Sequence, residues 1–437
     1  MHKVYISNFE PVKEAEINLE KQMQVLIGTQ ASGKSTVCKV VYFFRKIRDY
    51  TLNFLTDGEQ YFNNHENEYF NIYMKYLTKQ FMGCFGKTRH MRNLKLVYCF
   101  GEKTIEITLN KDGYVRFRFS DELKDKLNGL IAEAAGIFLD KLKSDEMNTV
   151  FDNITALALV KQQFRDRLYK LFENSAEIMY IPAGRSLLAT MSKQLQDFSI
   201  ADMDLTMQEF INLIRNTKSK FGSKIPDMVK DYTKTVKGQI NNSSIEMAYD
   251  LIRRILKADY TSESDGEKIY YDERHWVKLM YGSSGQQEVL WILMLIFVTI
   301  LEKKKSFVVI EEPEAHLFPI AQKDVMSLVA LLVNSTESKV IVTTHSPYVL
   351  TSLNILLYSD KVENNVKGKG EAVIRKSLRL NYNTFGAFKL SNQEKEQNSM
   401  ESLLDDESHM IDTDYIDEVS SITNYELERL LDREIDG

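Results

Sequence analysis

Near the start of the chain, apolar and polar residues alternate in three short runs, Val4 to Phe9, Ala15 to Leu19 and Met23 to Ile27. Alternation with a period of two is typical of half-buried β-strands. The third run ends in a glycine-rich turn, and a stretch with helical character, Lys34 to Ile47, follows directly. The pattern therefore predicts a strand, a loop and a helix in succession.

The middle of the chain changes character twice. Residues 50 to 95 are rich in aromatic residues and asparagine and show no clean period, but Leu94 to Phe119 returns to strand character, with a hairpin signal at 111–113. We expect an antiparallel β lobe there. Residues 120 to 260 have mostly helical patterns, interrupted by a short apolar strand, Met179 to Arg185.

Helices and strands alternate in the next part of the chain. After strand-like residues from Glu267 to Met280 come a buried helix, a strand, a second helix and a second strand, at 287–301, 307–310, 320–333 and 339–343. Such alternation is typical of a parallel α/β sheet. We expect four regions: 1–119 and 261–355 as two parts of one α/β head, 120–260 as a mostly helical insertion, and 356–437 as an acidic tail.

The overall composition fits this picture. A length of 437 residues, with 43% hydrophobic and 27% charged residues, is typical of two or three globular units. Cys38, Cys84 and Cys99 form no CxxC pair, which favours a reducing cytoplasm over a disulfide framework or a cysteine zinc site. The longest apolar run, Val289 to Leu301, is too short to cross a bilayer, so we expect no membrane span.

Charge is unevenly distributed. The net charge is −6, yet residues 391–437 hold 15 acidic and 3 basic residues, so the remaining 390 residues carry about +6. An acidic tail on a slightly basic body permits nucleic-acid contact without demanding it.

One motif lies in the turn between the third strand and the first helix. Its residues match GxxxxGK[ST], in which glycines let backbone N–H groups wrap phosphates at a helix N-terminus. Lys34 would reach the β- and γ-phosphates of ATP, and the Ser35 hydroxyl would ligate Mg²⁺. The predicted ATP-binding residues here are Gly28, Thr29, Gln30, Ala31, Ser32, Gly33, Lys34, Ser35 and Thr36.

An apolar strand, Phe307 to Ile310, delivers two carboxylates, Glu311 and Glu312, at its C-terminal end. Ligands bind at that end of strands in parallel α/β sheets. One carboxylate could hold the Mg²⁺ shell while its neighbour polarises the attacking water. Two acids at a strand end are a weak signal alone, and they gain weight beside the phosphate-binding turn.

Two further elements complete the set. Tyr281 to Gln287 forms a Ser-x-Gly-Gln turn at the start of the buried helix, which is typical either of an anion site or of a plain helix cap. His345 closes the strand at 339–343. A lone histidine after a strand is more often structural, but four elements in this order favour a functional role.

These elements together resemble those of ABC-type ATPases, and more narrowly the SMC, RecF and OLD-like branch. The turn at 28–35 resembles Walker A, Ser283 to Gln286 the signature loop, Val308 to Glu312 Walker B, and His345 the switch histidine. The stretch Glu311 to Pro319, with Thr343 to Pro347, resembles ATPases of OLD-type nucleases and of anti-phage systems such as Septu, Gabija and PARIS.

The resemblance implies an ABC-type P-loop α/β head and a head-to-tail dimer. Ser283, Gly285 and Gln286 of one subunit would complete the ATP site formed by the other, with Glu311 at the Mg²⁺ position. Glu312 would be the catalytic base and His345 would sense the γ-phosphate, alongside Lys34. A glutamate in place of the usual aspartate at 311, and Ser284 in place of a signature glycine, depart from the broad ABC pattern.

Some residues remain candidates with open alternatives. Gln162 or Gln163 could supply the Q-loop, and Arg185 could contact phosphate or an interface. Two basic spans, 75–95 and 215–237, could bind nucleic acid or be solvated surface, and the first mixes Lys75, Lys79, Lys87, Arg89, Arg92 and Lys95 with Tyr76, Phe81 and Phe85.

The tail invites a nuclease hypothesis through Asp412-Thr413-Asp414, but residues 351–437 are too few and too poor in apolar residues for a TOPRIM domain. An acidic docking or regulatory tail, with a short amphipathic helix at 425–431, is the favoured interpretation.

The predicted function is Mg²⁺-dependent ATP hydrolysis in a composite site of a homodimer or higher homo-oligomer in the cytoplasm. Nucleotide state would then act as a conformational switch that senses a trigger and gates a separate effector, a nuclease or toxin, in anti-phage defence. The alternative is a structural or repair ATPase that clamps DNA. A long coiled-coil arm would favour the alternative, and no sustained heptads occur between 120 and 260.

Overall fold

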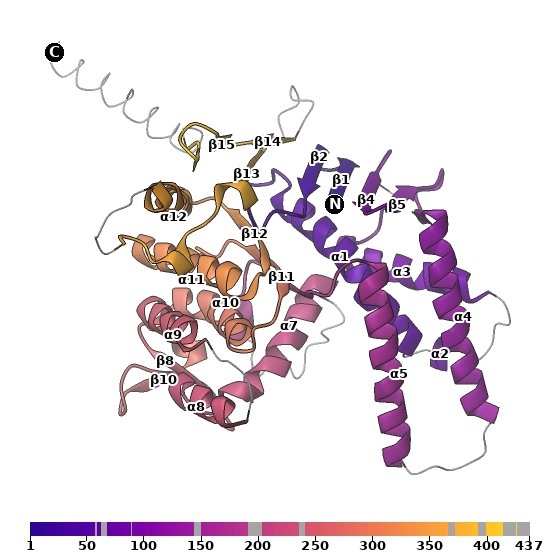
Figure 1. The fold of residues 1–437 in the computed structure, drawn as a ribbon, viewed down its shortest axis with the longest axis horizontal. Helices are drawn as coiled ribbons and strands as arrows, with labels where there is room; N and C mark the ends of the chain where they lie inside the picture. The colour runs from indigo at the N-terminus through magenta and orange to yellow at the C-terminus, as the bar shows by residue number, and fades with distance from the viewer. Residues whose placement is uncertain are drawn as a thin grey trace.

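A six-stranded sheet forms the centre of the molecule (Figure 1). The computed structural model describes residues 1–56, 59–62, 68–88, 90–143, 150–190, 203–235, 241–365, 372–391, 399–413 and 425. All strands of the sheet are parallel except the edge strand β14. Their order is β14 (Met400–Ser402), β13 (Phe385–Leu390), β3 (Met23–Gly28), β12 (Lys339–Thr344), β11 (Ser306–Glu311) and β7 (Glu177–Ile181).

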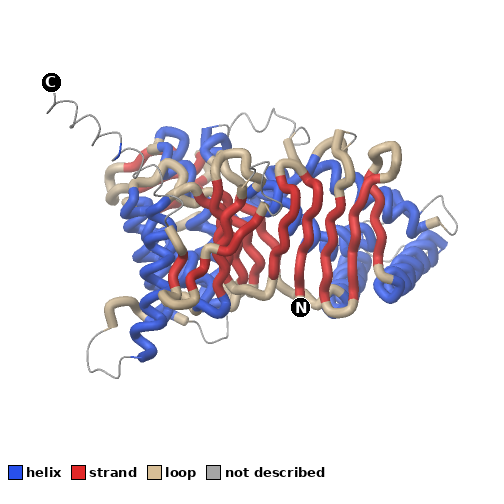
Figure 2. The backbone as a smooth tube through the Cα atoms, turned by 90° about the horizontal axis from the view of Figure 1, so that it is seen from above, coloured by secondary structure: helices blue, strands red, loops and turns tan. Residues whose placement is uncertain are grey.

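A five-stranded antiparallel sheet forms the expected β lobe, and Figure 2 shows its strands side by side. Its order is β2 (Val12–Asn18), β1 (His2–Phe9), β4 (Lys95–Phe100), β5 (Lys103–Leu109) and β6 (Val115–Phe119). One face is buried because alternate residues of each strand are apolar, as Val4 and Ile6 are in β1. The strands predicted at 4–9 and 94–119 are therefore confirmed.

Helix α1 (Lys34–Thr56) connects the two sheets, and most of its side chains are buried. It packs against α3 (Tyr69–Phe85), which the short α2 (Glu59–Phe62) precedes. The sequence analysis found no period between 50 and 95, whereas the described residues of this span include the end of α1 and the helices α2 and α3. The buried face of α3 is made by Tyr73, Leu77, Phe81 and Cys84, which are three or four residues apart.

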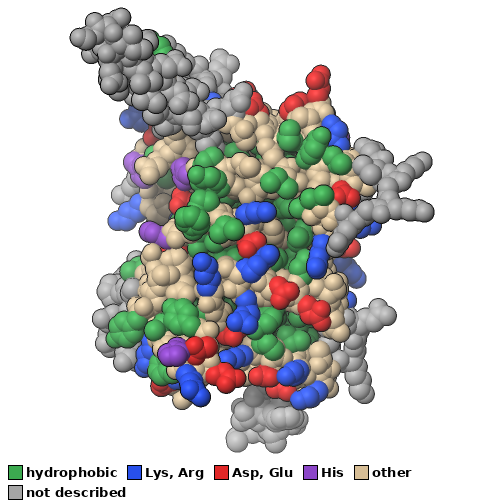
Figure 3. Space-filling model, turned by 90° about the vertical axis from the view of Figure 1, so that its left-hand side faces the viewer, with side chains coloured by type: hydrophobic (Ala, Val, Ile, Leu, Met, Phe, Trp, Pro, Cys, Tyr) green, Lys and Arg blue, Asp and Glu red, His purple; other side chains and the backbone are tan. Residues whose placement is uncertain are grey.

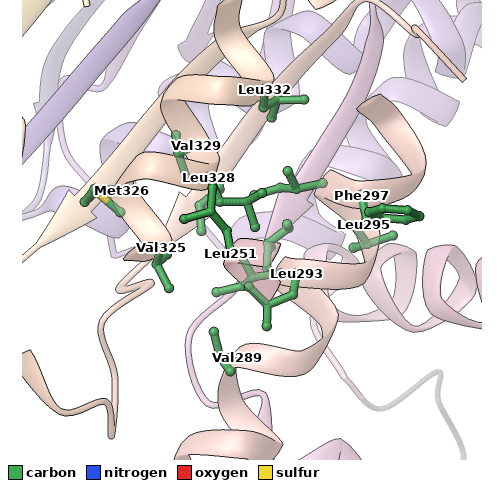
Figure 4. Packing of buried hydrophobic residues seen from close by; sticks show 14 of the residues in the cluster. Leu251, Val289, Leu293, Leu295, Phe297, Val325, Met326, Leu328, Val329 and Leu332 are labelled. Atoms are coloured by element: carbon green, nitrogen blue, oxygen red, sulfur yellow. The ribbon is translucent and has the colours of Figure 1, made fainter. Parts of the chain in front are cut away.

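A second core lies on the opposite face of the central sheet. It is built by α9 (Asn242–Leu256), α10 (Ser284–Leu301) and α11 (Pro319–Thr336), whose leucines and valines meet in Figure 4. Among the described residues, α10 is the one helix long and apolar enough to cross a membrane by length and composition. It is 89% buried, which is the behaviour of a core helix.

The region 120–260 contains two kinds of structure. The first is a pair of long helices, α4 (Asp121–Lys143) and α5 (Val150–Leu171), which extend from the body side by side (Figure 1). Arg167 of α5 donates two 2.7 Å hydrogen bonds to the Glu133 carboxylate of α4.

The second kind belongs to the head itself. Strand β7 completes the central sheet, and α7 (Leu205–Lys218) packs against it. The remaining elements here are α6 (Ser186–Thr190), α8 (Ile225–Thr235), α9 and the antiparallel strands β8 (Asp259–Glu263), β9 (Gly266–Tyr270) and β10 (Trp276–Lys278).

The C-terminal region differs from the expected acidic tail, because part of it belongs to the central sheet. After α12 (Pro347–Asn365), β13 pairs in parallel with β3 and buries Phe385, Ala387 and Leu390. The small strands β15 (Leu404–Asp405) and β16 (Met410–Ile411) then lie beside α12. The helix predicted at 425–431 lies outside the described residues, apart from Tyr425.

The packing of α11 makes a stability prediction. Leu328 is fully buried between α9 and α10, so Leu328→Ala should lower the free energy of unfolding by about 2–5 kcal/mol, through lost burial and a residual cavity. Ile320, on the same helix, is 66% exposed, and Ile320→Ala should change the free energy by less than about 0.5 kcal/mol. Urea unfolding monitored by circular dichroism checks both values, and equal losses would contradict the assigned core.

Candidate active site

Three neighbouring parallel strands of the central sheet end at one edge and bring the predicted motifs together. Strand β3 leads into the turn at 28–35, β12 leads to His345, and β11 ends at Glu311. Because β12 lies between β3 and β11, the histidine lies between the phosphate-binding turn and the acidic pair. Ligands bind at this edge of open α/β sheets.

The turn at 28–35, called the phosphate loop below, is shaped by close packing at two glycines. A Cβ atom on Gly28 would lie 2.4 Å from the Leu390 carbonyl oxygen, and one on Gly33 would lie 2.5 Å from a methyl group of Val12. Gly33 also has a φ of 95°, a backbone angle that residues other than glycine rarely adopt. Both glycines are therefore required by the backbone path.

Lys34 begins α1 and folds back over the loop. Its ammonium group donates to the carbonyl oxygens of Gly28 at 2.8 Å and Thr29 at 2.9 Å. Burial lowers the pKa of Lys34, whereas the carboxylates of Glu312, Glu314 and Glu311 oppose this shift. The positive charge of Lys34 thus lies in the field of the acidic strand end.

The loop also has an open side. Thr29, Gln30, Ala31 and Ser35 are exposed and Thr36 is half-buried, whereas Ser32 and Gly33 are buried. The N-terminus of α1 therefore faces solvent at Ser35, where free backbone N–H groups favour an anion.

Glu311 is buried at the end of β11. One carboxylate oxygen, Oε2, accepts a 3.1 Å hydrogen bond from the backbone N–H of Ala183. The other, Oε1, is buried and has no hydrogen-bond partner among the described residues. A buried carboxylate oxygen without a partner is costly, and a metal ion or a water of its shell would satisfy it.

Glu312 and His345 form a pair above the strand ends. The Nε2 atom of His345 lies 3.3 Å from Oε1 of Glu312, and both side chains are about one-third exposed. Glu312 has a φ of 42°, in the left-handed region, and its N–H contacts the carbonyl and hydroxyl oxygens of Thr343. The structure thus brings two of the three predicted catalytic residues, Glu312 and His345, together at the solvent-facing side of the site.

Glu314 is a residue of the site to which the sequence analysis gave no role. Its Oε1 accepts hydrogen bonds from the Thr344 hydroxyl at 2.6 Å and the His345 N–H at 2.9 Å. Burial raises the pKa of Glu314. Because this carboxylate joins the loops after β11 and β12, it sets the position of the histidine. The sequence could have indicated this residue, because Glu314 is the third acid of the Glu-Glu-Pro-Glu stretch.

Arg185 lies elsewhere than the sequence suggested. It is 1% exposed, and its guanidinium donates to the carbonyl oxygens of Pro182, Glu288, Glu311 and Glu312 at 2.6–2.9 Å. The Glu288 carboxylate in turn accepts the backbone N–H groups of Arg185 and Ser186. Arg185 therefore positions the acidic strand end instead of contacting phosphate or an interface.

The Ser-x-Gly-Gln turn is a helix cap in this structure. Ser283 caps α10 by accepting from the Gln286 N–H, and the Gln286 side chain accepts from the Ser283 N–H and donates to Leu256. A Cβ atom on Gly285 would lie 2.8 Å from the His316 carbonyl oxygen. Ser283 and Ser284 stay exposed, so the N-terminus of α10 faces solvent.

The Q-loop candidates do not reach the site. Gln162 and Gln163 are exposed on α5, and Gln162 bonds to Asp166 of the same helix. Helix α5 leads into the amino end of β7, which is the edge of the parallel sheet opposite to the phosphate loop.

Most described lysines in the second basic span have acidic partners. Lys218, Lys220, Lys230 and Lys234 pair with nearby acids, which supports a solvated surface, while Lys237 lies outside the described residues. Asp414 of the tail likewise lies outside them. Among the residues that the structure describes, no group of three His, Cys, Asp or Glu side chains forms a metal-binding cluster.

Comparison with known proteins gives the family. The family model of the AAA ATPase domain matches residues 1–350, so the chain belongs to this family and is an ATPase. No curated protein matches the chain.

Among solved structures, the chain is similar to an SMC head bound to the C-terminal winged-helix domain of ScpA, with 11% identity, a TM-score of 0.43 and 92% and 96% of the two chains covered. It is also similar to the SMC head of Thermotoga maritima, with 12% identity, a TM-score of 0.33 and coverages of 80% and 90%. A third similar structure is the Pyrococcus furiosus Smc head domain bound to the C-terminal domain of ScpA. Its sequence identity is 11% and its TM-score is 0.41, with 92% of this chain and 96% of that chain covered.

The contacts of Arg185 make a second prediction. Arg185→Met should lower the free energy of unfolding by about 3–5 kcal/mol, because it leaves the buried Glu288 carboxylate without its counter-charge and removes the donor to several carbonyl oxygens. Arg167→Met, which removes a half-exposed ion pair on α5, should cost less than about 1 kcal/mol. Urea unfolding measures both, and an Arg185 variant as stable as the Arg167 variant would refute the positioning role.

Proposed function

We propose that this ATPase hydrolyses ATP with Mg²⁺ in a site shared by two copies of the chain, and that its nucleotide state works as a conformational switch. The observation that carries the proposal is the alignment of the phosphate loop, His345 and the Glu311–Glu312 pair on three adjacent strands. In this arrangement the loop N–H groups and Lys34 bind phosphate, while Glu312 accepts a proton from the attacking water. His345, held against Glu312, would sense the γ-phosphate.

The residues fit a magnesium ion. Ser35 is exposed at the helix start, and Oε1 of Glu311 lacks a partner in the part of the chain that the structure describes. Two oxygen ligands of this kind suit Mg²⁺, which retains several waters and takes further ligands from substrate phosphates. Bound there, the ion would neutralise charge on the phosphate oxygens. Ser35 and Glu311 are the residues that would hold it.

Exposed apolar side chains support a homodimer. Tyr281 precedes the α10 cap, Phe318 and Ile320 follow the acidic loop, and Tyr348 follows His345, and each is more than half exposed. Large exposed apolar groups that gather in one area mark interaction surfaces. Figure 3 shows hydrophobic side chains gathered on the side of the molecule where α9, α11 and α12 lie. A partner covering these residues would also bring its own Ser283 and Gly285 to the nucleotide.

The output of the switch is a further part of the proposal. Opening and closing of the dimer would gate a separate effector, a nuclease or toxin, in cytoplasmic anti-phage defence. This part rests on the likeness of the Glu-Glu-Pro-Glu and Thr-Thr-His-Ser-Pro stretches to such systems. Co-purification of a stoichiometric nuclease or toxin with ATP-bound protein from its native host would support it, and nucleic acid alone would count against it.

Two substitutions separate binding from hydrolysis. Lys34→Ala should abolish ATP binding, because it removes the buried ammonium group from the phosphate loop. Glu312→Gln should keep binding but reduce the hydrolysis rate by at least about 100-fold, since it removes the general base. The Glu312 variant should also accumulate as an ATP-bound dimer in light scattering. If Glu312→Gln hydrolyses ATP at the parent rate, the base is misassigned.

Mixing variants tests whether the site is shared. Ser283→Arg and Lys34→Ala should each be inactive, but an equal mixture should recover about one quarter of the parent rate, because half of the dimers contain one intact composite site. A mixture of Lys34→Ala with Glu312→Gln is the control and should stay inactive, since both residues belong to the same half-site. A silent first mixture would argue against head-to-tail sharing.

Nucleic-acid binding is a second candidate function, and one observation favours it. Lys75 and Arg116 line a cavity of about 390 Å³ between α3 and β6, and a 2.9 Å hydrogen bond from Thr88 to Gly113 brings the loop holding Lys87 beside it. These exposed cations form no ion pairs among the described residues. The aromatic residues of the span, Tyr76, Phe81 and Phe85, pack inward, and Arg89 lies outside the described residues. The surface therefore suits the phosphates of a duplex better than stacked bases.

The corresponding test uses charge reversal. Lys75→Glu, Lys87→Glu and Arg116→Glu together should weaken binding of a 30-base-pair DNA duplex and reduce the salt dependence of log K by about three. Lys230→Glu with Lys234→Glu, on the paired surface of α8, serves as the control. Fluorescence anisotropy at several salt concentrations provides the readout. Unchanged affinity in the triple variant would leave this span as solvated surface.

A further inference from the structure

A cavity of about 840 Å³ lies beside the edge strand β7, away from the phosphate loop. It is walled by α1, α5, α7 and residues 177–180 of β7, and Lys304 and Lys305 also line it. Among the described strands β7 ends the central sheet, so its outer backbone groups have no neighbouring strand. The volume is that of a small-molecule site.

The lining has a surplus of positive charge. Six basic residues face three acidic ones, Asp49, Glu177 and Glu209. All three acids are already paired, since Asp49 contacts Lys46 and Arg48, Glu209 contacts Lys46, and Glu177 contacts Lys304. The two cations that α5 contributes to the lining have no acidic partner within the described residues. Lys161 and Arg165 are spaced four residues apart and therefore lie on one face of that helix.

The lining also offers a surface for a flat ring. Tyr169 lies with its ring 4.6 Å from the guanidinium carbon of Arg48, which fixes its orientation. Asn53, Asn212 and Asn216 supply amide groups. An aromatic ring, amides and cations without an acidic partner together suit a ligand that carries both a ring and an anionic group.

We propose that this cavity binds a phosphorylated ligand of nucleotide size, with its phosphate held by Lys161, Arg165 and Lys46 and its ring against Tyr169. The site is distinct from the phosphate loop and does not require hydrolysis of ATP. An anion here would compete with Glu209 for Lys46, and Glu209 also accepts a hydrogen bond from the Tyr42 hydroxyl. The ligand would therefore act on the contacts that hold α7 against α1.

These contacts connect the cavity to the acidic strand end. Lys39, Tyr42 and Lys46, on one face of α1, all contact acids of α7, namely Asp204 and Glu209. The Tyr42 ring in turn lies 5.1 Å from the Tyr180 ring of β7. Burial and the nearby Glu311 carboxylate raise the pKa of Tyr180. The cavity and the proposed magnesium ligand are thus separated by two tyrosines in contact.

The test uses AMP and pyrophosphate as probes for the full-length chain, in isothermal titration calorimetry. AMP lacks the β- and γ-phosphates that the phosphate loop would hold, and titrations of both the parent protein and Lys34→Ala distinguish the two sites. We expect one AMP per chain in each protein, with an affinity at least about tenfold higher than that of pyrophosphate, because only AMP carries a ring.

Matched substitutions on α5 then locate the site. Arg165→Glu should weaken AMP binding by at least about tenfold, whereas Arg167→Glu should not, because Arg167 faces Glu133 of α4. Circular dichroism confirms that each variant is folded, and Lys161→Glu provides a second variant if Arg165→Glu is not. Absence of AMP binding, equal effects of the two arginine variants, or loss of binding in Lys34→Ala would each overturn the proposal. If the parent protein binds AMP but does not hydrolyse ATP, the proposed function fails while the proposal for this cavity stands.

Discussion

The buried guanidinium of Arg185 is the interaction on which the candidate site depends. A strand that ends inside a protein leaves carbonyl groups that must be satisfied, and β7 and β11 end side by side. One side chain serves three of these carbonyls, those of Pro182, Glu311 and Glu312, while Glu288 of α10 neutralises its charge. The acidic pair is consequently held by groups from three elements far apart in sequence. Its geometry is a property of the assembled core and not of the Glu-Glu dipeptide.

Helix α1 gives the phosphate loop an equally firm base. It begins at Lys34 in the site, runs between the two sheets and ends against α3, with buried residues on nearly every turn. Side chains that pack on both sheets leave the helix little freedom to shift alone. The β lobe and the ATP site are therefore mechanically one unit. By contrast, α7 is held to α1 by polar contacts, which exchange more readily with solvent or ligands.

Local sequence sufficed wherever one segment contains both an element and its chemistry. The strand, glycine turn and helix at 23–47, and the acids after Phe307–Ile310, are of this kind, and the structure places them at one sheet edge. Other features depend on partners that are distant in the sequence. Strand β13 pairs with a strand more than 350 residues away, and the positioning role of Arg185 depends on its ion pair with Glu288. In α3 the buried residues Tyr73, Leu77 and Phe81 have helical spacing, but aromatic residues also occupy the other faces of the helix and obscure this period. Glu288 is the one acid within the apolar helix at 284–301, and an acid in such a helix indicates a buried basic partner.

Helix α12 starts two residues after His345, and its middle part is hydrogen-bonded to a segment at 407–411. Asn354 exchanges two hydrogen bonds with the backbone of Ile411, and Lys361 donates to the carbonyl of Glu407. Because one helix joins the two places, a displacement of His345 would also shift the segment at 407–411. The strand ends of the candidate site and the segment at 407–411 are therefore coupled through a single helix, so a movement of either one would move the other.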